Sequence, residues 1–332
     1  MEMQDQAAAI NRDKQLSCHS AYSRLFAKGR LTIGLIAPLE THPGRTTPTM
    51  KDHAAMASKA DEQGFGALWL RDIPFFDPEY GDVGQVFDPI AYLGFLIAHT
   101  KNIALGTAGL VLPFREPLIL GKQIASLDNL SESRLLFGIS SGDRPAEYPM
   151  FGVDFDTRGE RFRETYDLFK KVTEQSYPEF SSARFGRGTG ALDLLPKPMK
   201  GIIPAIAIGH AQQDEDWIAA NLDGLIRAAP APAHFHAITR RWKSALQSTG
   251  NPDMFKPLGV GCYLDLVDDP SAPLFRIPGG FRVGRYALKD FLELAQDAGI
   301  NHVALNPKAS TRPFREIMDE IALDILPLFS SN

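Results

Sequence analysis

The chain has 332 residues, of which 44% are hydrophobic and 23% charged, and its formal net charge is −5 at pH 7. This composition is typical of an ordinary globular domain. Because the chain is mildly acidic, it does not carry the overall positive charge that favours nucleic-acid binding. Its cysteines, Cys18 and Cys262, have no spacing typical of zinc ligation, so neither a metal site nor a disulfide framework is expected.

Localisation and partners follow from the same features. No apolar run reaches the roughly 20 residues of a membrane helix, and polar residues stand where a signal peptide would be apolar. We therefore expect a cytoplasmic protein with no membrane or nucleic-acid partner. Residues 1–30 are polar and alanine-rich and predict an N-terminal arm that docks loosely or joins an oligomer contact.

From residue 31 onward, apolar runs of strand length alternate with helical segments. The runs begin near residues 31, 66, 103, 135, 202, 224, 258 and 302. This count predicts an α/β fold, a (β/α)8 TIM barrel, formed as one domain over residues 31–332.

Longer segments interrupt this alternation, and excursions are predicted after the fourth, fifth and seventh strands. The segment 143–156 is rich in turn formers and aromatic residues, 178–201 contains a cluster of glycines, and 268–285 is broken by proline and glycine. The glycine cluster lacks the preceding strand and following helix that a phosphate loop requires. We interpret it as an exposed, flexible insertion of low regularity.

The unit 102–143 is predicted as strand, loop, helix, strand and loop, and both strands end in small residues. These are Thr107, Ala108 and Gly109 in the first strand, and Ser140, Ser141 and Gly142 in the second. A crossover helix makes the strands parallel, so both ends lie at one edge of the sheet, where small residues leave room for a flat ligand. Tight turns without any ligand are the alternative explanation.

The turn after the fifth strand is a second candidate site. It comprises Gly209, His210, Ala211, Gln212 and Gln213. If these residues open the next helix, free backbone N–H groups and the helix dipole converge there, which suits a phosphate. Acidic residues at 214–216 equally stabilise a helix start without a ligand.

The second strand ends in two charged residues, Arg71 and Asp72, followed by a loop rich in aromatic residues. Charged residues at the end of a strand that is otherwise buried belong at the open mouth of the barrel. Asp72 is therefore the candidate catalytic residue, able to orient a substrate or move a proton. A salt bridge that holds the loop is the alternative interpretation for both residues. The aromatic loop predicts part of a pocket wall.

The stretches GTAGLVLPFREPLILGKQIASLDNLSESRLLFGISSG and FGVDFDTRGERF resemble the bacterial luciferase-like family of flavin- and deazaflavin-dependent oxidoreductases. The resemblance extends to GFGALWLRDIPF and PAIAIGHAQQDEDWIAANLDGLI, and so covers most of residues 31–228. It implies a (β/α)8 barrel that holds FMN, or a deazaflavin, at the carboxyl ends of the strands. It also implies a non-planar or cis peptide at Ala108–Gly109 against the isoalloxazine, a flavin tail near 140–142, and a phosphate at 209–213.

Two departures from the family pattern concern the chemistry. Several relatives have a histidine where this chain has Ile73, and bacterial luciferase has an arginine where this chain has Ser141. The resemblance therefore implies no light emission, and another cation must meet part of the phosphate charge. The candidates are Arg144, Arg158, Arg161 and Arg285.

The favoured function is a two-component monooxygenase that takes reduced FMN from a separate flavin reductase and oxidises a small organic substrate, since no nicotinamide-binding fingerprint is visible. The alternatives are a non-catalytic flavin-binding protein on the same barrel and a deazaflavin-dependent dehydrogenase or reductase. A cofactor-free lyase or hydrolase is disfavoured because Asp72, His210 and Asp265 are scattered. The apolar helix predicted at 89–99 favours a homodimer.

Overall fold

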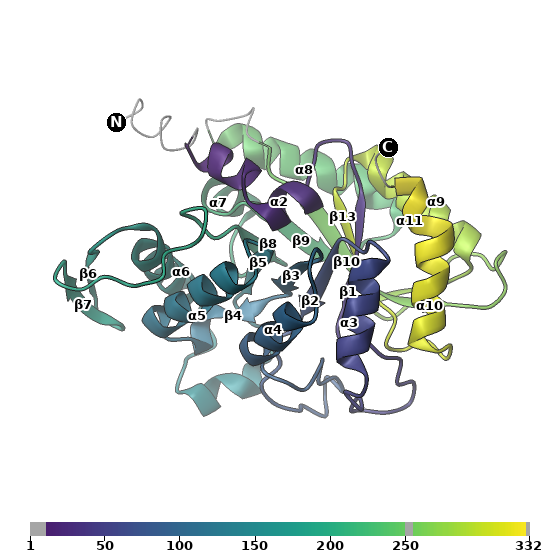
Figure 1. Ribbon diagram of the computed structural model, residues 1–332, viewed down its shortest axis with the longest axis horizontal. Coiled ribbons are helices and arrows are strands. Elements are labelled where there is room, and N and C mark those ends of the chain that lie inside the picture. Colours follow the sequence, from purple (N-terminus) through teal and green to yellow (C-terminus); the bar gives the residue numbers. More distant parts are fainter. Residues whose placement is uncertain (1–10, 250–254, 330–332) are drawn as a thin grey trace.

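The computed structural model of the protein describes residues 11–249 and 255–329. Within them, eight parallel strands close into a barrel (Figure 1), which confirms the predicted fold. In barrel order they are β1 (Thr32–Ile36), β2 (Ala67–Leu70), β3 (Ala104–Thr107), β5 (Leu135–Ser140), β8 (Ala205–Ile208), β9 (Gly224–Ala228), β10 (Leu258–Leu266) and β13 (His302–Asn306). The barrel closes where β13 pairs with β1, with Thr32 opposite His302.

Helices surround the barrel on its outer face (Figure 1). They are α3 (His53–Glu62), α4 (Pro89–Ala98), α5 (Pro117–Leu130), α6 (Arg158–Glu174), α7 (Glu215–Asn221), α8 (Phe235–Ser248), α9 (Arg285–Ala298), α10 (Phe314–Glu320) and α11 (Leu326–Phe329). Local sequence sets their ends. Asp88 caps α4 by accepting from the N–H groups of Ile90 and Ala91, and Gly299, at φ 92°, ends α9.

Two of the excursions contain short antiparallel pairs. β6 (Glu179–Ser182) and β7 (Gly186–Thr189) form a hairpin that projects from the barrel at the left of Figure 1. β11 (Phe275–Ile277) and β12 (Gly280–Val283) extend the sheet beside β10. The hairpin is exposed as predicted, but it is regular, since Gly186 at φ 82° permits the reversal.

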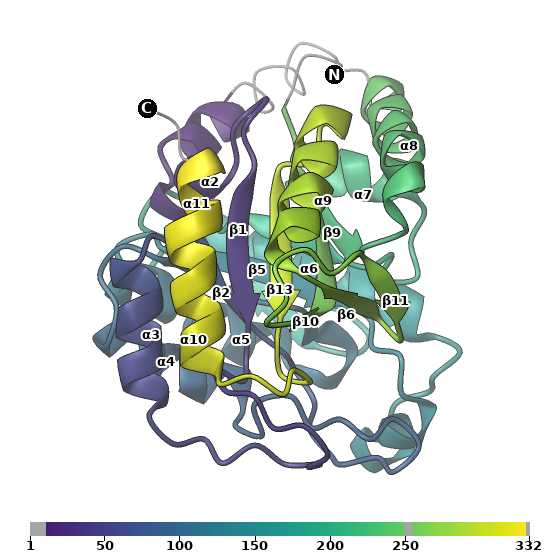
Figure 2. The same ribbon diagram turned by 90° about the vertical axis from the view of Figure 1, so that its right-hand side faces the viewer.

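The prediction of an excursion after the fifth strand is wrong. Only residues 209–214 separate β8 from α7, and the hairpin precedes β8 because it follows α6. Instead, a long segment, 71–88, follows the second strand. In Figure 2 the strands run downward to the side where the long loops lie, with α2 (Ser20–Leu25) at the other end.

Residues 11–26 fill that other end of the barrel. Leu16, Tyr22, Leu25 and Phe26 are buried in a cluster with Trp69 and other residues of the inner barrel wall. The prediction of a loosely docked arm is therefore wrong for this segment. Its apolar residues at helical spacing form a face that the barrel interior covers. Within the described ranges, no helix combines the length and apolarity needed to span a bilayer.

The barrel interior contains a buried polar pair. The Trp69 indole N–H donates to Nε2 of His302 at 2.9 Å, and Nδ1 of His302 lies 2.8 Å from Thr32 Oγ1. Because the Trp69 donor faces Nε2, that nitrogen must be the acceptor and His302 must be neutral. Glycine makes room for the pair, since a Cβ on Gly106 would lie 2.4 Å from the Trp69 ring.

The buried Trp69–His302 pair predicts that the folded state loses stability in acid. Burial lowers the pKa of His302 to about 3, well below its value in an unfolded chain. The unfolded state therefore gains the proton first as the pH falls below about 6.5, and the stability present above that pH is lost towards pH 3. We expect the contribution of His302 to the free energy of unfolding to be lower by about 2 kcal/mol at pH 5 than at pH 7.

Chemical denaturation at the two pH values measures this effect. His302→Gln keeps a neutral acceptor for Trp69 and should remove the His302 contribution, so that its change in unfolding free energy between pH 7 and pH 5 differs from that of the native protein by about 2 kcal/mol. His236→Gln, at an exposed site, should leave it intact. An equal pH dependence in all three proteins would contradict the assignment.

Candidate functional site

A cavity of about 600 Å³ opens at the carboxyl ends of the barrel strands, within the size range of small-molecule sites. It brings together most of the residues predicted from the sequence, namely Asp72, Ala108, Gly109, Ser140, Ser141, Gly142, Gly209, His210, Ala211 and Gln212. Thr107 and Gln213 do not line it. The Thr107 hydroxyl donates to the Gly138 carbonyl at 2.6 Å, and the Gln213 amide donates to the Gly159 carbonyl at 3.0 Å.

The peptide between Ala108 and Gly109 is cis, as predicted. It lies on the cavity wall, where Ser140 Oγ donates to the Gly109 carbonyl at 3.2 Å. A Cβ on Gly109 would lie 2.8 Å from the Ile208 side chain, so only glycine fits at this position. A second, mainly apolar cavity of about 310 Å³ adjoins the first and shares Ala108 with it. The cis peptide therefore lies at the boundary between the two cavities, beside larger shared side chains such as Ile208 and Tyr263.

The segment 140–142 forms the next part of the wall. Gly142 has φ 79°, and a Cβ there would lie 2.6 Å from the Tyr148 hydroxyl. Tyr148 is fully buried, and its hydroxyl donates to the Ser141 carbonyl. The Ser141 hydroxyl has no hydrogen-bond partner within residues 11–249 and 255–329. Tyr148 thus fixes this backbone while one hydroxyl remains available to a ligand.

The turn after β8 differs from the prediction. Helix α7 begins at Glu215, and its N-cap Asp214 accepts from the Trp217 N–H at 2.7 Å, so the acidic side chain satisfies the helix start. Residues 209–213 are a loop in which Ala211 and Gln212 have positive φ, 48° and 59°. In the described part of the chain, nothing accepts from the backbone N–H groups of residues 210–212. Unpaired N–H groups in such a turn are suited to an anion without a helix dipole.

The Gln213 side chain holds this loop in place. Its amide donates to the carbonyls of Gly159 and Ala211, at 3.0 and 3.1 Å, and its carbonyl accepts from Arg163. The role assigned to Gln213 from the sequence is therefore indirect. The side chain points towards α6 and keeps Ala211 in its left-handed conformation.

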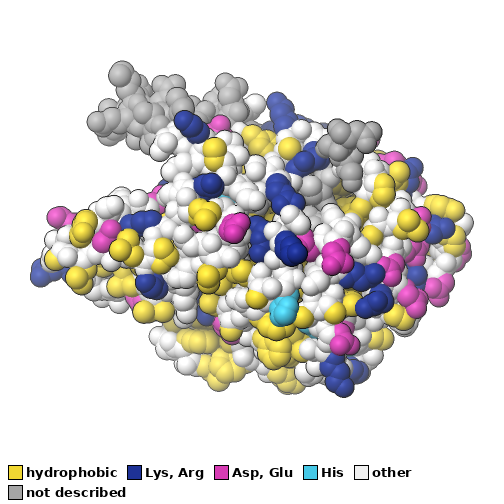
Figure 3. All heavy atoms as spheres, viewed as in Figure 1, with side chains coloured by type: hydrophobic (Ala, Val, Ile, Leu, Met, Phe, Trp, Pro, Cys, Tyr) yellow, Lys and Arg dark blue, Asp and Glu magenta, His cyan; other side chains and the backbone are white. Residues whose placement is uncertain are grey.

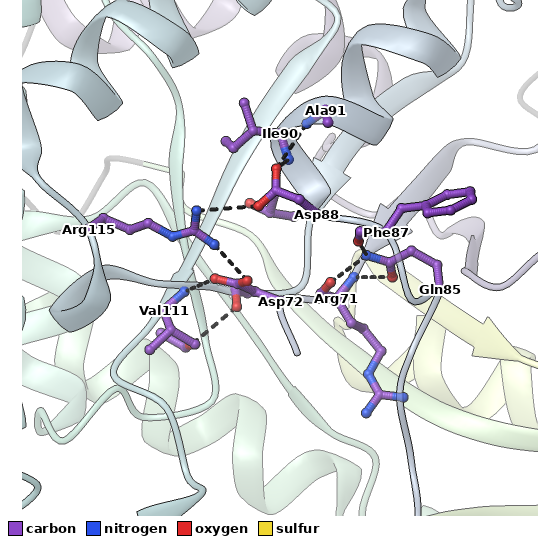
Figure 4. Close-up of polar contacts among 12 residues, drawn as sticks. Arg71, Asp72, Gln85, Phe87, Asp88, Ile90, Ala91, Val111 and Arg115 are labelled. Carbon is purple, nitrogen blue, oxygen red and sulfur yellow. Dashed lines mark hydrogen bonds and ion pairs between the residues drawn. The ribbon is translucent and has the colours of Figure 1, made fainter. Parts of the chain in front are cut away.

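Asp72 is nearly buried, with a side chain 2% exposed, and both of its oxygens are occupied (Figure 4). Oδ2 accepts from the Val111 N–H at 2.9 Å, and Oδ1 pairs with Arg115 at 2.7 Å. Burial raises the pKa of Asp72, and Arg115 opposes the shift. In Figure 4 the Arg71 side chain points away from Asp72. Asp72 thus joins the end of β2 to the strand β4 (Leu110–Val111).

Sequence reasoning missed Asp82, which links several parts of the mouth. Its carboxylate pairs with Arg71, with Lys308 at 2.6 Å and with the Tyr263 hydroxyl at 3.0 Å. Although burial opposes it, Arg71 and Lys308 hold the pKa of Asp82 well below its usual value. The salt-bridge interpretation is thus correct for Arg71. The contact fixes the loop 71–88, whose Tyr80 lines the cavity, as the aromatic wall was predicted to do.

Glu147 is a second residue that the sequence did not reveal. It lies in the 3-10 helix η2 (Pro145–Phe151), next to Tyr148, and lines the cavity with only 5% of its surface exposed. Within the part of the chain that is described, its Oε1 has no hydrogen-bond partner. Burial raises the pKa of Glu147 to about 7, against the opposing charge of Arg144.

The four arginines proposed to meet the phosphate charge differ in their distance from the cavity and in their partners. Arg144 lines the cavity, and Arg158 opens α6 beside Gly159, where a Cβ would lie 3.0 Å from that of Gln212. Arg161 instead donates to the Pro113 carbonyl at 2.8 Å. Arg285 pairs with carboxylates of the C-terminal helical segment. Of the four candidates, Arg144 therefore lies at the cavity and Arg158 near the loop 209–213.

The (β/α)8 barrel with its cavity at the carboxyl ends of the strands defines the structural class. A family model described as luciferase-like monooxygenase matches residues 31–264, and the chain belongs to this family. The alkanal monooxygenase alpha chain of Photorhabdus laumondii subsp. laumondii is 30% identical over 133 residues, which are 40% of this chain. The match spans only 36% of that relative.

Solved structures agree on the fold. Monooxygenase RslO1 from Streptomyces bottropensis has a TM-score of 0.72 at 18% identity, covering 90% of this chain and 100% of that one. An F420-dependent secondary alcohol dehydrogenase, in complex with an F420–acetone adduct, has a TM-score of 0.73 at 18% identity, covering 91% and 100%. At these identities the likeness establishes the barrel alone.

Proposed function

We propose that the protein is a flavin-dependent monooxygenase that uses reduced FMN and oxygen on a small organic substrate. The observation that carries the proposal is that the Ala108–Gly109 peptide, the segment 140–142 and the unpaired N–H groups of 210–212 line one cavity. These features match, in order, a flat ring, a polyhydroxyl tail and a phosphate. A separate flavin reductase would supply the reduced cofactor.

In this proposal each part of the wall has one task. Ala108 and Gly109 present small side chains to the isoalloxazine, the hydroxyls of Ser140 and Ser141 bind the ribityl tail, and the loop 209–212 binds the phosphate. The flavin, when bound, supplies the redox chemistry. The protein orients it, limits the access of water and leaves the adjoining apolar cavity for part of the substrate. Asp72 then acts by holding the β2–β4 junction rather than by touching substrate.

The runner-up is a deazaflavin-dependent dehydrogenase or reductase. The likeness in fold to an F420-dependent alcohol dehydrogenase supports it, and the same cavity suits a tricyclic ring. A non-catalytic flavin-binding protein is the third possibility. The free Cys18 and Cys262 are consistent with the cytoplasmic location that we propose for any of the three.

Oxygen consumption separates these functions. Purified protein supplied with reduced FMN by a flavin reductase should bind the cofactor and consume oxygen faster with the right member of a substrate panel. Binding of a reduced deazaflavin, with hydride transfer to a ketone and no oxygen uptake, would replace the proposal by the runner-up. Binding of FMN with no change in oxygen chemistry would favour the non-catalytic protein.

We also propose a homodimer formed through α4 and its surroundings. Phe87 and Phe95 are 51% and 45% exposed, and Tyr92 stacks on Phe95 at 5.9 Å. Figure 3 shows hydrophobic side chains gathered around α4 on this face. Exposed aromatic clusters of this kind are enriched in interfaces, and a second copy would cover the same patch on both subunits.

Light scattering at micromolar concentration tests the dimer. We expect twice the mass of the chain for the native protein and a shift towards the monomer for Phe95→Asp. Glu79→Gln, at an exposed site on the loop 71–88, serves as the control and should keep the dimer mass. A monomer mass for the native protein would defeat the proposal.

A further inference from the structure

Four carboxylates line the cavity: Asp72, Asp82, Asp143 and Glu147. Those of Asp72 and Asp82 are occupied by cations and hydrogen-bond donors. Asp143 is exposed to solvent. Of these cavity-lining residues, Glu147 alone is both buried and left with an unpaired oxygen. A buried polar atom without a partner requires an explanation, because its desolvation is not compensated.

The position of Glu147 is fixed by its neighbours. Its N–H donates to the Arg144 carbonyl at 3.2 Å, and the adjacent Tyr148 ring lies between Phe114 and Phe155, with ring centroids 4.7 and 4.9 Å away. The Phe75 backbone, close to the carboxyl group of Glu147, lowers its pKa. Glu147 is therefore held on the wall while Oε1 stays unpaired, as a group prepared for a ligand would be.

The charges around Glu147 permit both protonation states. Burial is the main reason that its pKa rises to about 7, and the charges of Asp72 and Asp143 add to the shift. Arg144 opposes it, and Arg115 neutralises part of the Asp72 charge. An acid and its conjugate base are then both present at neutral pH, which suits proton transfer.

We propose that Glu147 is the proton donor of this site, acting from Oε1. The inference rests on the proposed monooxygenase function. In that reaction, substrate, O2, FMNH⁻ and one proton give oxygenated substrate, FMN and water. When bound, the reduced cofactor would supply the two electrons, one oxygen atom would enter the substrate, and the other would become water.

Glu147 gives the consumed proton to the oxygen atom that leaves as water. Its carboxylate then remains beside Arg144 and recovers a proton from solvent through the open mouth. Without substrate, the same donor serves the oxidation of FMNH⁻ by O2, which takes up one proton and releases hydrogen peroxide. This second reaction needs no knowledge of the substrate.

Infrared titration of the flavin-free protein is the first test. We expect the C=O band of a protonated carboxylic acid to titrate near neutral pH and to be absent in Glu147→Gln. Glu79→Gln, which removes an exposed carboxylate outside the cavity, should keep the band. A fully ionised Glu147 at pH 6 would overturn the proposal.

Peroxide release from the protein loaded with reduced FMN is the second test. Glu147→Gln preserves the shape of the side chain, so FMN should bind as in the native protein. We expect release at pH 7 to fall by about 100-fold and its pH dependence near neutrality to vanish. Glu147→Asp should recover part of the rate. An unchanged pH profile in Glu147→Gln would refute the role.

The two tests separate failure of the inference from failure of the proposed function. If the native protein does not bind FMN, the monooxygenase function fails, and with it the donor role, whatever the infrared titration shows. If FMN binds and peroxide forms identically in native protein and Glu147→Gln, the function stands and the donor role fails.

Discussion

Replacing Arg12 by alanine is expected to lower the free energy of unfolding by about 3–5 kcal/mol, because it leaves a buried carboxylate unpaired. Arg12 binds Asp223 through Nε and Nη2, both at 2.7 Å, and its Nη1 reaches Glu174 at 3.0 Å. Asp223 is fully buried. Burial alone would raise the pKa of Asp223, but Arg12 holds it below its usual value.

The sign of the pH dependence follows. A carboxyl group with a lowered folded pKa stabilises the protein above its unfolded pKa of about 3.9, and this contribution is lost as the pH falls. The difference between native protein and Arg12→Ala should therefore shrink in acid. Arg241→Ala is the control, since Arg241 is 62% exposed and 4.0 Å from Glu215, and should cost less than about 0.5 kcal/mol. Urea titrations measure the free energy of unfolding of both variants. Similar losses in the two would show that the Arg12–Asp223 pair does not hold residues 11–26 against the end of the barrel.

Ala108→Leu is expected to weaken FMN binding by at least about 100-fold, or about 2.7 kcal/mol. Ala108 lies on the wall of both cavities and is partly exposed, so a leucine there extends into the space between them. The ring that we place against this surface would be displaced. Fluorescence quenching of FMN measures the loss.

The control for Ala108→Leu is Ala220→Leu, at an exposed position of α7. Both variants should keep the native circular dichroism spectrum, and only the first should lose FMN. Native affinity in folded Ala108→Leu would move the ring site away from β3.

The fold was predictable because each barrel strand is a short apolar run between helical segments, a pattern that survives in a single sequence. The convergence of residues 108–109 and 140–142 on one cavity was predictable for a related reason, since the carboxyl ends of parallel strands meet at one edge of the sheet. Thr107 was included wrongly in the wall because alternation along a strand sends its side chain to the Gly138 carbonyl.

The remaining parts of the site depend on tertiary contacts. Asp82 lies in a loop and Glu147 in the short 3-10 helix η2, neither of which has a periodic sequence pattern. No spacing relates Asp82 to Tyr263 or Lys308, which meet it only in the folded mouth. The start of α7 was misplaced because Asp214 competes for the role of N-cap. Gln213 shows the same limit, since its partners on α6 lie about fifty residues away along the chain.

The ratio of the dissociation constants of FMN and riboflavin for the native protein is the most direct test of the central claim. The two ligands share the ring and the ribityl chain and differ by the phosphate, which we place on the N–H groups of residues 210–212. Hydrogen bonds to a charged group contribute about 1.5–3 kcal/mol, so FMN should bind roughly 10- to 100-fold more tightly. Equal affinities for the two ligands would contradict the proposed phosphate site.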